Sequence, residues 1–253
     1  MSNYRPLLST VLNNNSLKDT FSFKQFKIDQ DQCAMKIGTD GVLLGAWTHL
    51  GQNPESILDI GAGTGLIALM LAQRCGAEVV DAIEIDANAY EQCVENFEVS
   101  PWADRLYCYH AGLDEFIEEM EEPYELIVCN PPFYVENVSS GNQQRDQARQ
   151  NEYLPFDELL EGVTALLTEN GTFATIIPFK EETQFIALAA TFGLYPKRCL
   201  HIRGNEKSEI KRALLEFTFK RNSCVVEELI IEKERHVYTA DYVNLTKDFY
   251  LKM

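Results

Sequence analysis

Apolar and polar positions alternate in blocks along residues 56–220, and the blocks have in turn the lengths of strands and helices. Short apolar runs are followed by longer stretches in which apolar side chains recur at helical spacing. This alternation predicts a parallel α/β sheet. The predicted strands are Ser56–Ile60, Glu78–Ile85, Arg105–His110, Leu126–Cys129, Thr172–Ile177, Tyr195–Ile202 and Ala213–Lys220.

Between these runs the pattern predicts helices that would cover the sheet. They are Leu66–Arg74, Ala87–Val99, Asp114–Met120, Phe156–Leu167 (ended by Asn170-Gly171) and Glu181–Phe192. No helix separates the last two predicted strands, so we expect them to pair antiparallel. The chain then closes with a strand at Val225–Ile231 and a helix at Tyr238–Tyr250. The predicted fold is therefore a doubly wound, mostly parallel, seven-stranded sheet of the Rossmann-like class.

The segment before the sheet reads as a small N-terminal extension. Phe21–Ile28 is predicted to be a strand. The turn Gly38-Thr39-Asp40-Gly41 leads into a short apolar helix, with Thr39 or Asp40 either capping that helix or facing a ligand. We predict an extension over residues 1–50 that packs on a main domain over residues 51–253.

Composition narrows the class of protein. Of 253 residues 45% are hydrophobic and 24% are charged, which is ordinary for a globular protein. There is no long apolar run and no signal-peptide plan, so no membrane role is expected. Seven cysteines without a C-x-x-C pair, and four scattered histidines, predict neither a disulfide framework nor a metal site. The expected protein is a cytoplasmic monomer without a metal.

The charge of the chain indicates which kinds of partner it can bind. A net charge of −17 works against binding nucleic acid, because phosphates attract local Lys and Arg. The charge is uneven, however, since the stretch from Lys197 to Arg221 holds eight basic and three acidic residues. That stretch is either a solvated edge of alternating charge or a local contact surface for nucleic acid.

A glycine turn gives the first chemical signal. The run Asp59-Ile60-Gly61-Ala62-Gly63-Thr64-Gly65 follows the first predicted strand and opens a helix. Its G-x-G-x-G spacing differs from the G-x-G-x-x-G that holds a dinucleotide pyrophosphate, so it suits a ligand without pyrophosphate. Glu84 ends the second strand and can accept hydrogen bonds from both ribose hydroxyls. Together these features favour S-adenosylmethionine (SAM) over NAD.

A second corner follows the fourth strand, at Asn130-Pro131-Pro132-Phe133. Two prolines end the ladder and stiffen the backbone. The Asn130 side-chain oxygen and the Pro131 carbonyl can both accept from one –NH₂ group, and Phe133 offers a flat face on which a ring can stack. The first and fourth strands are neighbours in a doubly wound sheet, so both corners meet at one cleft. The two corners together predict N-methylation of a planar amino group. The same tetrapeptide also fits a purely structural role, in which the strand ends in a Pro-Pro turn and the Phe packs in the core.

Several longer motifs make the chain resemble one family. They are FSFKQF at Phe21–Phe26, CAMKIGTDGVLLGAW at Cys33–Trp47, Pro101-Trp102-Ala103, NPPFY, Arg145 with Gln147-Ala148-Arg149, and the tail with Leu245-Thr246 and Phe249-Tyr250-Leu251. These resemble the bacterial tRNA1(Val) adenine-37 N6-methyltransferases, within the class I SAM-dependent methyltransferases. The resemblance implies methyl transfer from SAM to the N6 of adenine 37 in the anticodon loop of that tRNA.

The same resemblance implies roles for individual residues. Asn130, Pro131, Pro132 and Phe133 would hold the target adenine. The cofactor would be held by Thr39, Asp40, Asp59, Gly61, Gly63, Gly65, Glu84, Gly112 and Leu113. In one respect the chain departs from the family, because Gly112 stands where an Asp usually contacts the SAM adenine. Either backbone groups and Leu113 suffice there, or Asp114 substitutes.

Three other readings fit part of the pattern. A protein glutamine has a side-chain –NH₂ that suits the same corner. Adenines of DNA or ribosomal RNA also suit it, although the chain has no added target-recognition domain. A SAM-binding protein without catalysis would keep the glycine turn but would not need the NPPF corner.

Overall fold

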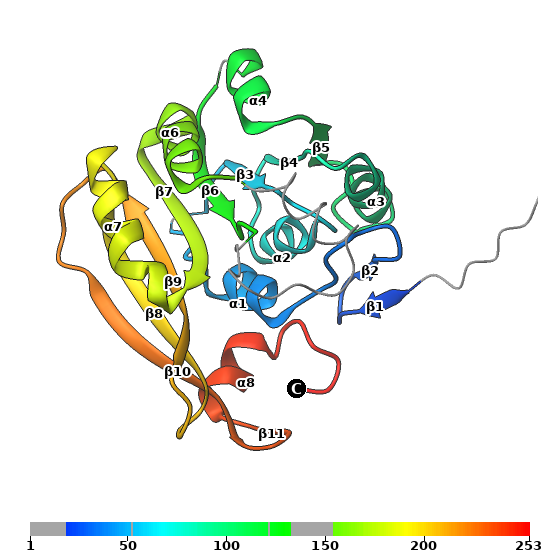
Figure 1. The fold of residues 1–253 in the computed structure, drawn as a ribbon. Helices are drawn as coiled ribbons and strands as arrows, with labels where there is room; N and C mark the ends of the chain where they lie inside the picture. The colour runs from blue at the N-terminus through cyan, green and yellow to red at the C-terminus, as the bar shows by residue number, and fades with distance from the viewer. Residues whose placement is uncertain (1–18, 52, 121, 133–153) are drawn as a thin grey trace, which may run out of the picture.

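The structure is a computed structural model and describes residues 19–51, 53–120, 122–132 and 154–253. Its centre is a twisted sheet with helices on both faces (Figure 1). Over the described residues this sheet has nine strands, in the order β11-β10-β8-β9-β7-β6-β3-β4-β5. The strands are β3 (Ser56–Ile60), β4 (Val79–Glu84), β5 (Leu106–His110), β6 (Tyr124–Cys129), β7 (Leu167–Pro178), β8 (Tyr195–Asn205), β9 (Ile210–Thr218), β10 (Val225–Glu234) and β11 (Val237–Tyr238).

The strand directions confirm the predicted α/β class. β5, β4, β3, β6 and β7 are parallel neighbours, and β9 pairs antiparallel with both β7 and β8. The predicted closing strand at Val225–Ile231 is confirmed as β10. It joins the sheet parallel to β8, and the short β11, which was not predicted, pairs with β10, so the sheet has nine strands and not seven over the described residues.

Helices cover the sheet in two layers. They are α1 (Thr39–Trp47), α2 (Leu66–Arg74), α3 (Ala87–Glu98), α4 (Leu113–Glu119), α6 (Phe156–Leu166), α7 (Glu182–Thr191), α8 (Ala240–Thr246) and the single 3₁₀ turn η1 (Phe179–Glu181). Successive side chains of a strand point to opposite faces. Accordingly Ile57 of β3 packs in the core under α1, α2 and α3, whereas Leu58 packs under α4, α6 and α7. None of the helices in this described part of the chain combines the length and apolar character needed to cross a bilayer.

The predicted strand Phe21–Ile28 is wrong, because two short strands replace it. β1 (Thr20–Ser22) and β2 (Lys27–Asp29) pair antiparallel. The Phe23 N–H donates to the Phe26 carbonyl at 2.9 Å, and both rings are buried and stacked with centroids 4.6 Å apart. Two large apolar side chains on a tight turn anchor the hairpin to the core, so they do not extend a single strand.

Some predicted helix ends also shift. The helix α6 ends at Leu166, before the predicted Asn170-Gly171 stop, because Leu167 already pairs with Tyr124 of β6. The final helix is shorter than Tyr238–Tyr250, and the Thr239 side chain caps it by accepting from the Tyr242 N–H.

Candidate active site

A cavity of about 690 Å³ opens at the carboxyl ends of β3, β4 and β6. This is the position at which open parallel sheets bind their ligands, and the volume falls within the usual range for small-molecule sites. Several residues singled out from the sequence line it, namely Gly61, Gly63, Glu84, Gly112, Leu113, Asn130 and Pro132. The fold therefore brings the glycine turn and the proline corner into one space.

Strand register explains why the two corners meet. β3 and β6 are parallel neighbours, and Ile60 lies opposite Cys129. Gly61 follows Ile60, and Asn130 follows Cys129. Both residues therefore come directly after the same pair of the sheet, and both line the cavity. The predicted adjacency of the first and fourth strands is confirmed.

The glycine turn has the backbone shape that only glycine adopts freely. Gly61 and Gly63 have φ of +70° and +56°. A Cβ added at either position would meet nothing within 4 Å. The turn thus leaves an open cradle on the cavity side, in which a ligand can approach the backbone closely.

Gly65 is different. Its φ is +78°, and a Cβ there would lie 2.5 Å from the Phe97 ring and 2.9 Å from the Cys93 sulfur. It does not line the cavity. The structure places Gly65 at the start of α2, where it allows that helix to pack tightly on α3.

The Glu84 carboxylate is fixed at the cavity wall by two backbone groups. Its Oε2 accepts from the Gly63 N–H at 2.8 Å, and its Oε1 accepts from the Asp86 N–H at 2.9 Å. The side chain is buried, yet Glu84 lines the cavity. Each oxygen keeps a further lone pair. The carboxylate can therefore accept from a pair of ligand hydroxyls without moving.

Asp86 caps the next helix. Its Oδ1 accepts from the Ala89 N–H at 2.8 Å, at the start of α3.

Asp59 lies behind the glycine turn and does not line the cavity. Its carboxylate is fully buried, and Oδ2 accepts from the Ala68 N–H at 3.1 Å. Burial raises the pKa of Asp59 to about 7, while the Ala68 hydrogen bond opposes the rise and the nearby charge of Glu84 adds to it. This carboxyl group ties β3 to the first turns of α2.

The raised pKa of Asp59 predicts a pH-dependent stability. Its folded pKa of about 7 exceeds the ordinary 3.8, so the folded state keeps a proton that the unfolded chain loses between these values. This contribution to the free energy of unfolding is complete below pH 3.8 and disappears as pH rises through 7. The Asp59→Asn variant has no carboxyl group to titrate at this position. Its free energy of unfolding, compared with that of the wild type at the same pH, should therefore increase from pH 4 to pH 7, by up to about 4 kcal/mol.

Urea unfolding of both proteins at pH 5, 6, 7 and 8 measures this difference. Parallel stability profiles for the wild type and the Asn variant would show that Asp59 does not carry the raised pKa.

The Asp114 carboxylate lies directly beside Gly112. A Cβ added at Gly112 would lie 2.7 Å from Oδ1 of Asp114, so the Asp114 carboxylate occupies the space beside it. Gly112, Leu113 and Asp114 all line the cavity, at the start of α4. Leu113 in turn packs so closely on Gly162 of α6 that a Cβ there would meet it at 2.6 Å.

Thr39 and Asp40 do not line the cavity. The helix α1 begins at Thr39 with Gly38 as its N-cap, so neither predicted residue caps it. Oδ2 of Asp40 instead accepts from Nε of Arg212 at 2.7 Å. The helix still abuts the proline corner, since a Cβ at Gly41 would lie 4.0 Å from Nδ2 of Asn130.

Within the proline corner, Asn130 and Pro132 line the cavity, and Pro131 is buried beside them. Phe133, Arg145 and Arg149 lie outside the described residues.

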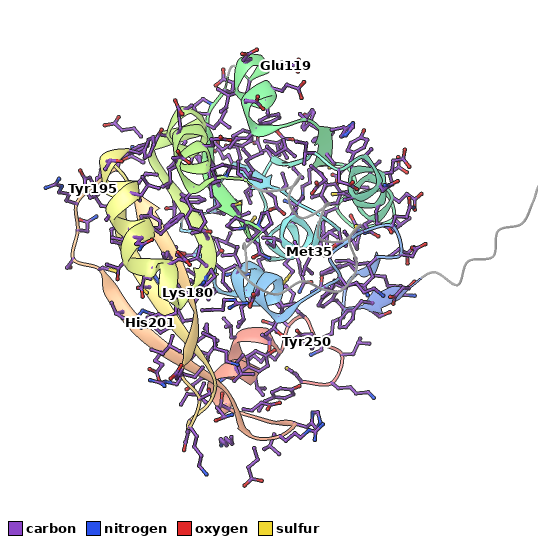
Figure 2. The ribbon with its side chains drawn as sticks, in the orientation of Figure 1. Met35, Glu119, Lys180, Tyr195, His201 and Tyr250 are labelled. Atoms are coloured by element: carbon purple, nitrogen blue, oxygen red, sulfur yellow. The ribbon has the colours of Figure 1, made fainter. Side chains whose placement is uncertain are left out.

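Sequence reasoning missed other parts of the wall. Met35 and Ile85 line the cavity with exposed fractions of 48% and 56%, which is unusual for large apolar side chains. Figure 2 shows Met35 over the middle of the molecule. Ile85 directly follows the acid that ends β4, a signal that was available in the sequence. The part played by α6, through Glu158 and Gly162, depends on tertiary packing alone.

Comparison with known proteins places this site in a family. The methyltransferase small domain family matches residues 38–197. Three curated relatives share the name tRNA1(Val) (adenine(37)-N6)-methyltransferase. The protein of Flavobacterium psychrophilum is 60% identical over 92% of this chain and 100% of its own length. That of Bacteroides fragilis is 45% identical over 92% and 98%, and that of Pectobacterium carotovorum is 40% identical over 93% and 95%.

Solved structures agree on the fold. A predicted O-methyltransferase from Agrobacterium tumefaciens has a TM-score of 0.63 at 18% identity, over 83% of this chain and 96% of that one. A putative transferase from Pyrococcus horikoshii has a TM-score of 0.56 at 16% identity, over 78% and 70%. Identity this low shows the fold alone. The relatives and the matched domain together show that this chain belongs to the methyltransferase small domain family and, within it, to the bacterial tRNA1(Val) (adenine(37)-N6)-methyltransferases.

Proposed function

We propose that the protein transfers a methyl group from SAM to the N6 amino group of adenine 37 in the anticodon loop of tRNA1(Val). The observation that carries the proposal is the register of β3 and β6, which puts Gly61 and Asn130 on one cavity. The relatives of 40–60% identity, which carry the name of this activity, support the same substrate.

The cavity residues fit SAM. The open cradle at Gly61 and Gly63 would admit SAM against the backbone, and the Glu84 carboxylate, which two backbone groups hold in place, would accept from the ribose hydroxyls. The exposed apolar side chain of Ile85 and that of Leu113 give the adenine ring an apolar setting. SAM, when bound, supplies an electrophilic methyl group on a sulfonium sulfur.

Asn130 and Pro131 act on the amine that receives the methyl group. The lone pair of adenine N6 is delocalised into the ring, so this nitrogen is a poor nucleophile. Hydrogen bonds from the amine to the Asn130 oxygen and the Pro131 carbonyl favour a pyramidal nitrogen. They also stabilise the positive charge that develops there during transfer. The proton leaves after the new bond forms, so attack needs no general base.

The target base must leave its stack to enter the cavity. A nucleotide in a loop does this at lower cost than one in a duplex. Phe133 is proposed to replace part of the lost stacking.

The basic stretch between Lys197 and Arg221 is only partly free to meet RNA. Three of its arginines form ion pairs, namely Arg198 with Glu216, Arg203 with Glu228 and Arg212 with Asp40. The lysines Lys207 and Lys211 are exposed. Contacts with phosphates are therefore assigned to the lysines, and tRNA binding should weaken steeply with added salt.

Labelled SAM tests the substrate directly. The enzyme should label bulk tRNA, and nucleoside mass analysis should identify the product as N6-methyladenosine. Release factor, incubated in parallel, should stay unlabelled. Label on a protein glutamine in place of tRNA would contradict the proposal, as would absence of methyl transfer to any RNA.

Asp114 is expected to take over the adenine contact that Gly112 lacks. One hydrogen bond to a charged acceptor contributes about 1.5–3 kcal/mol, so Asp114→Ala should weaken binding of S-adenosylhomocysteine by ~10-fold or more. Calorimetric titration measures this affinity. Glu118→Ala is the matched control, because Glu118 also lines the cavity and is not proposed to bind the adenine. Equal affinity in the wild type and Asp114→Ala would exclude the contact.

A further inference from the structure

A second group of reactive side chains lies away from the cavity, on the face of the sheet that α7 covers. It contains Glu182, the first residue of α7, together with Cys199 and His201 of β8. None of the three lines the cavity. In Figure 2, His201 lies on the side of α7 and β8, whereas Met35 lies over the centre of the molecule. The group is thus separate from the proposed methyl-transfer site.

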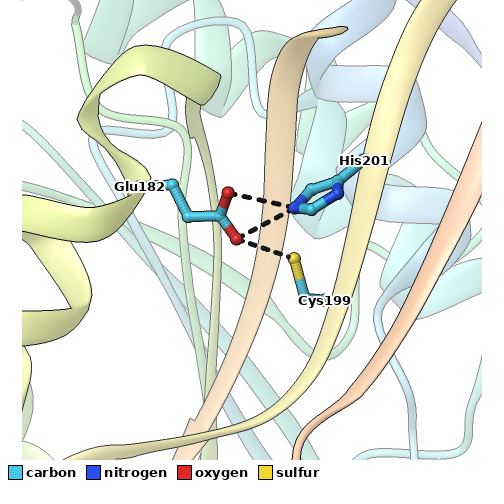
Figure 3. Close-up of side chains that lie close together, drawn as sticks. All are labelled: Glu182, Cys199 and His201. Atoms are coloured by element: carbon cyan, nitrogen blue, oxygen red, sulfur yellow. Dashed lines mark hydrogen bonds and ion pairs between the residues drawn. The ribbon is translucent and has the colours of Figure 1, made fainter.

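The fold brings these residues together by strand alternation. Cys199 and His201 are two residues apart on one strand, so their side chains leave the same face of the sheet. The start of α7 passes over that face and brings the Glu182 carboxylate to face both the imidazole and the thiol (Figure 3). One ligand atom from each residue lies within 4.8 Å of the other two.

The contacts within the group are short. Nε2 of His201 lies 3.0 Å from both carboxylate oxygens of Glu182, and Sγ of Cys199 lies 3.1 Å from Oε1. Cys199 is buried, while the side chains of His201 and Glu182 are 19% and 15% exposed. The Phe179 ring packs edge-on against the imidazole at 4.9 Å. The group is largely shielded from water, and only His201 and Glu182 among its three residues keep part of their surface exposed.

Its chemistry argues against a nucleophilic cysteine. The Cys199 thiol is buried and lies 3.1 Å from the Glu182 carboxylate. A reactive cysteine needs the reverse, an electropositive setting that favours the thiolate. A divalent cation among these three groups would supply that positive charge and would bind thiolate, imidazole and carboxylate together.

We propose that Glu182, Cys199 and His201 form a binding site for Zn²⁺. A sulfur, a nitrogen and an oxygen donor are the ligand types that zinc takes in proteins. The sequence predicted no metal site, because a single Cys-x-His pair and a glutamate seventeen residues earlier match no familiar spacing.

The distances allow a metal with little rearrangement. Tetrahedral Zn²⁺ with bonds of about 2.0–2.3 Å separates neighbouring donor atoms by roughly 3.3–3.6 Å. The present contacts of 3.0 and 3.1 Å are hydrogen-bond distances between the same atoms. Each of these two pairs has to open by only about half an ångström, which rotation of the Glu182 side chain can provide. The His201 nitrogen and the Cys199 sulfur, which lie within 4.8 Å of each other, have to stand roughly 3.6 Å apart.

Three protein ligands leave a fourth tetrahedral position, which solvent would fill. The site would join the start of α7 to the middle of β8, so its expected role is to hold α7 on the sheet. This inference does not depend on the methyl-transfer proposal.

Cobalt substitution tests the site. The full chain, stripped with a chelator, should bind one equivalent of Co²⁺ and develop a thiolate-to-cobalt charge-transfer band that Zn²⁺ abolishes. Cys199→Ser should remove the band. Glu182→Gln and His201→Gln should each weaken Co²⁺ binding by more than ~10-fold, since even outer-shell partners of a metal contribute that much.

Two matched variants serve as controls. Cys75→Ser removes another partly buried thiol and His110→Gln another histidine, and both should keep the band. His201→Gln also covers the case in which the buried Cys199 variant does not fold, because His201 is partly exposed. A wild type without a charge-transfer band, or a band that survives both His201→Gln and Cys199→Ser, would overturn the proposal.

Discussion

Replacing Asn130 with alanine is expected to lower kcat for tRNA methylation by ~10²–10³-fold, the range seen when one preorganised polar group is removed from a transition state. Asn130 lines the cavity at the end of β6, next to α1 and level with the glycine turn. Its amide oxygen is the side-chain acceptor for the amine that becomes positively charged. The Pro131 carbonyl remains in the variant, so activity should fall without disappearing.

The Asn130 experiment has a matched partner in Asn130→Asp, which keeps an acceptor oxygen of the same reach. The Asp variant should be more active than the Ala variant, and SAM affinity should change little in either, because Asn130 is not assigned to the cofactor. Steady-state kinetics and calorimetry separate the two quantities. Near-normal turnover of Asn130→Ala would show that the amide does not take part in transfer.

The second large effect is expected at Glu84. Glu84→Ala should weaken binding of SAM by ~10²-fold, because two hydrogen bonds to a charged acceptor are lost at once. The same change also releases the Gly63 and Asp86 N–H groups that the carboxylate now holds. Loss of affinity should therefore exceed any loss in kcat at saturating SAM.

Glu84→Gln is the control for Glu84. The glutamine keeps one oxygen acceptor, so its affinity for SAM should lie between those of the wild type and Glu84→Ala. Calorimetric titration with SAM and with S-adenosylhomocysteine measures all three proteins. If Glu84→Ala binds SAM as tightly as the wild type, the ribose contact is misplaced.

The position of the site could be predicted from the sequence because it depends on local signals. The glycine turn, the acid at the end of the second strand and the Asn-Pro-Pro corner each end a strand, and parallel strands deliver their carboxyl ends to one edge. The doubly wound order makes the first and fourth strands neighbours, and the structure adds the register in which Ile60 pairs with Cys129.

Other features depend on tertiary packing, which no local pattern encodes. The parallel addition of β10 to β8, and the hairpin that Phe23 and Phe26 anchor, were not predicted for this reason. The same holds for the α6 side of the cavity and for the approach of Glu182 to Cys199. Thr39 and Asp40 begin the helix α1 and do not line the cavity, so their proposed contact with SAM stays a prediction.

In the proposed reaction the methyl donor and the target amine meet where β3 and β6 end. A crystal structure with a non-reactive SAM analogue and an adenosine-containing anticodon loop would show whether they do. We expect the ribose of the analogue on Glu84, and adenine N6 between the Asn130 oxygen and the Pro131 carbonyl, about 3–3.5 Å from the position of the transferred methyl group. An analogue bound outside this cavity, or an Asn130 amide turned away from the adenine, would contradict the proposal.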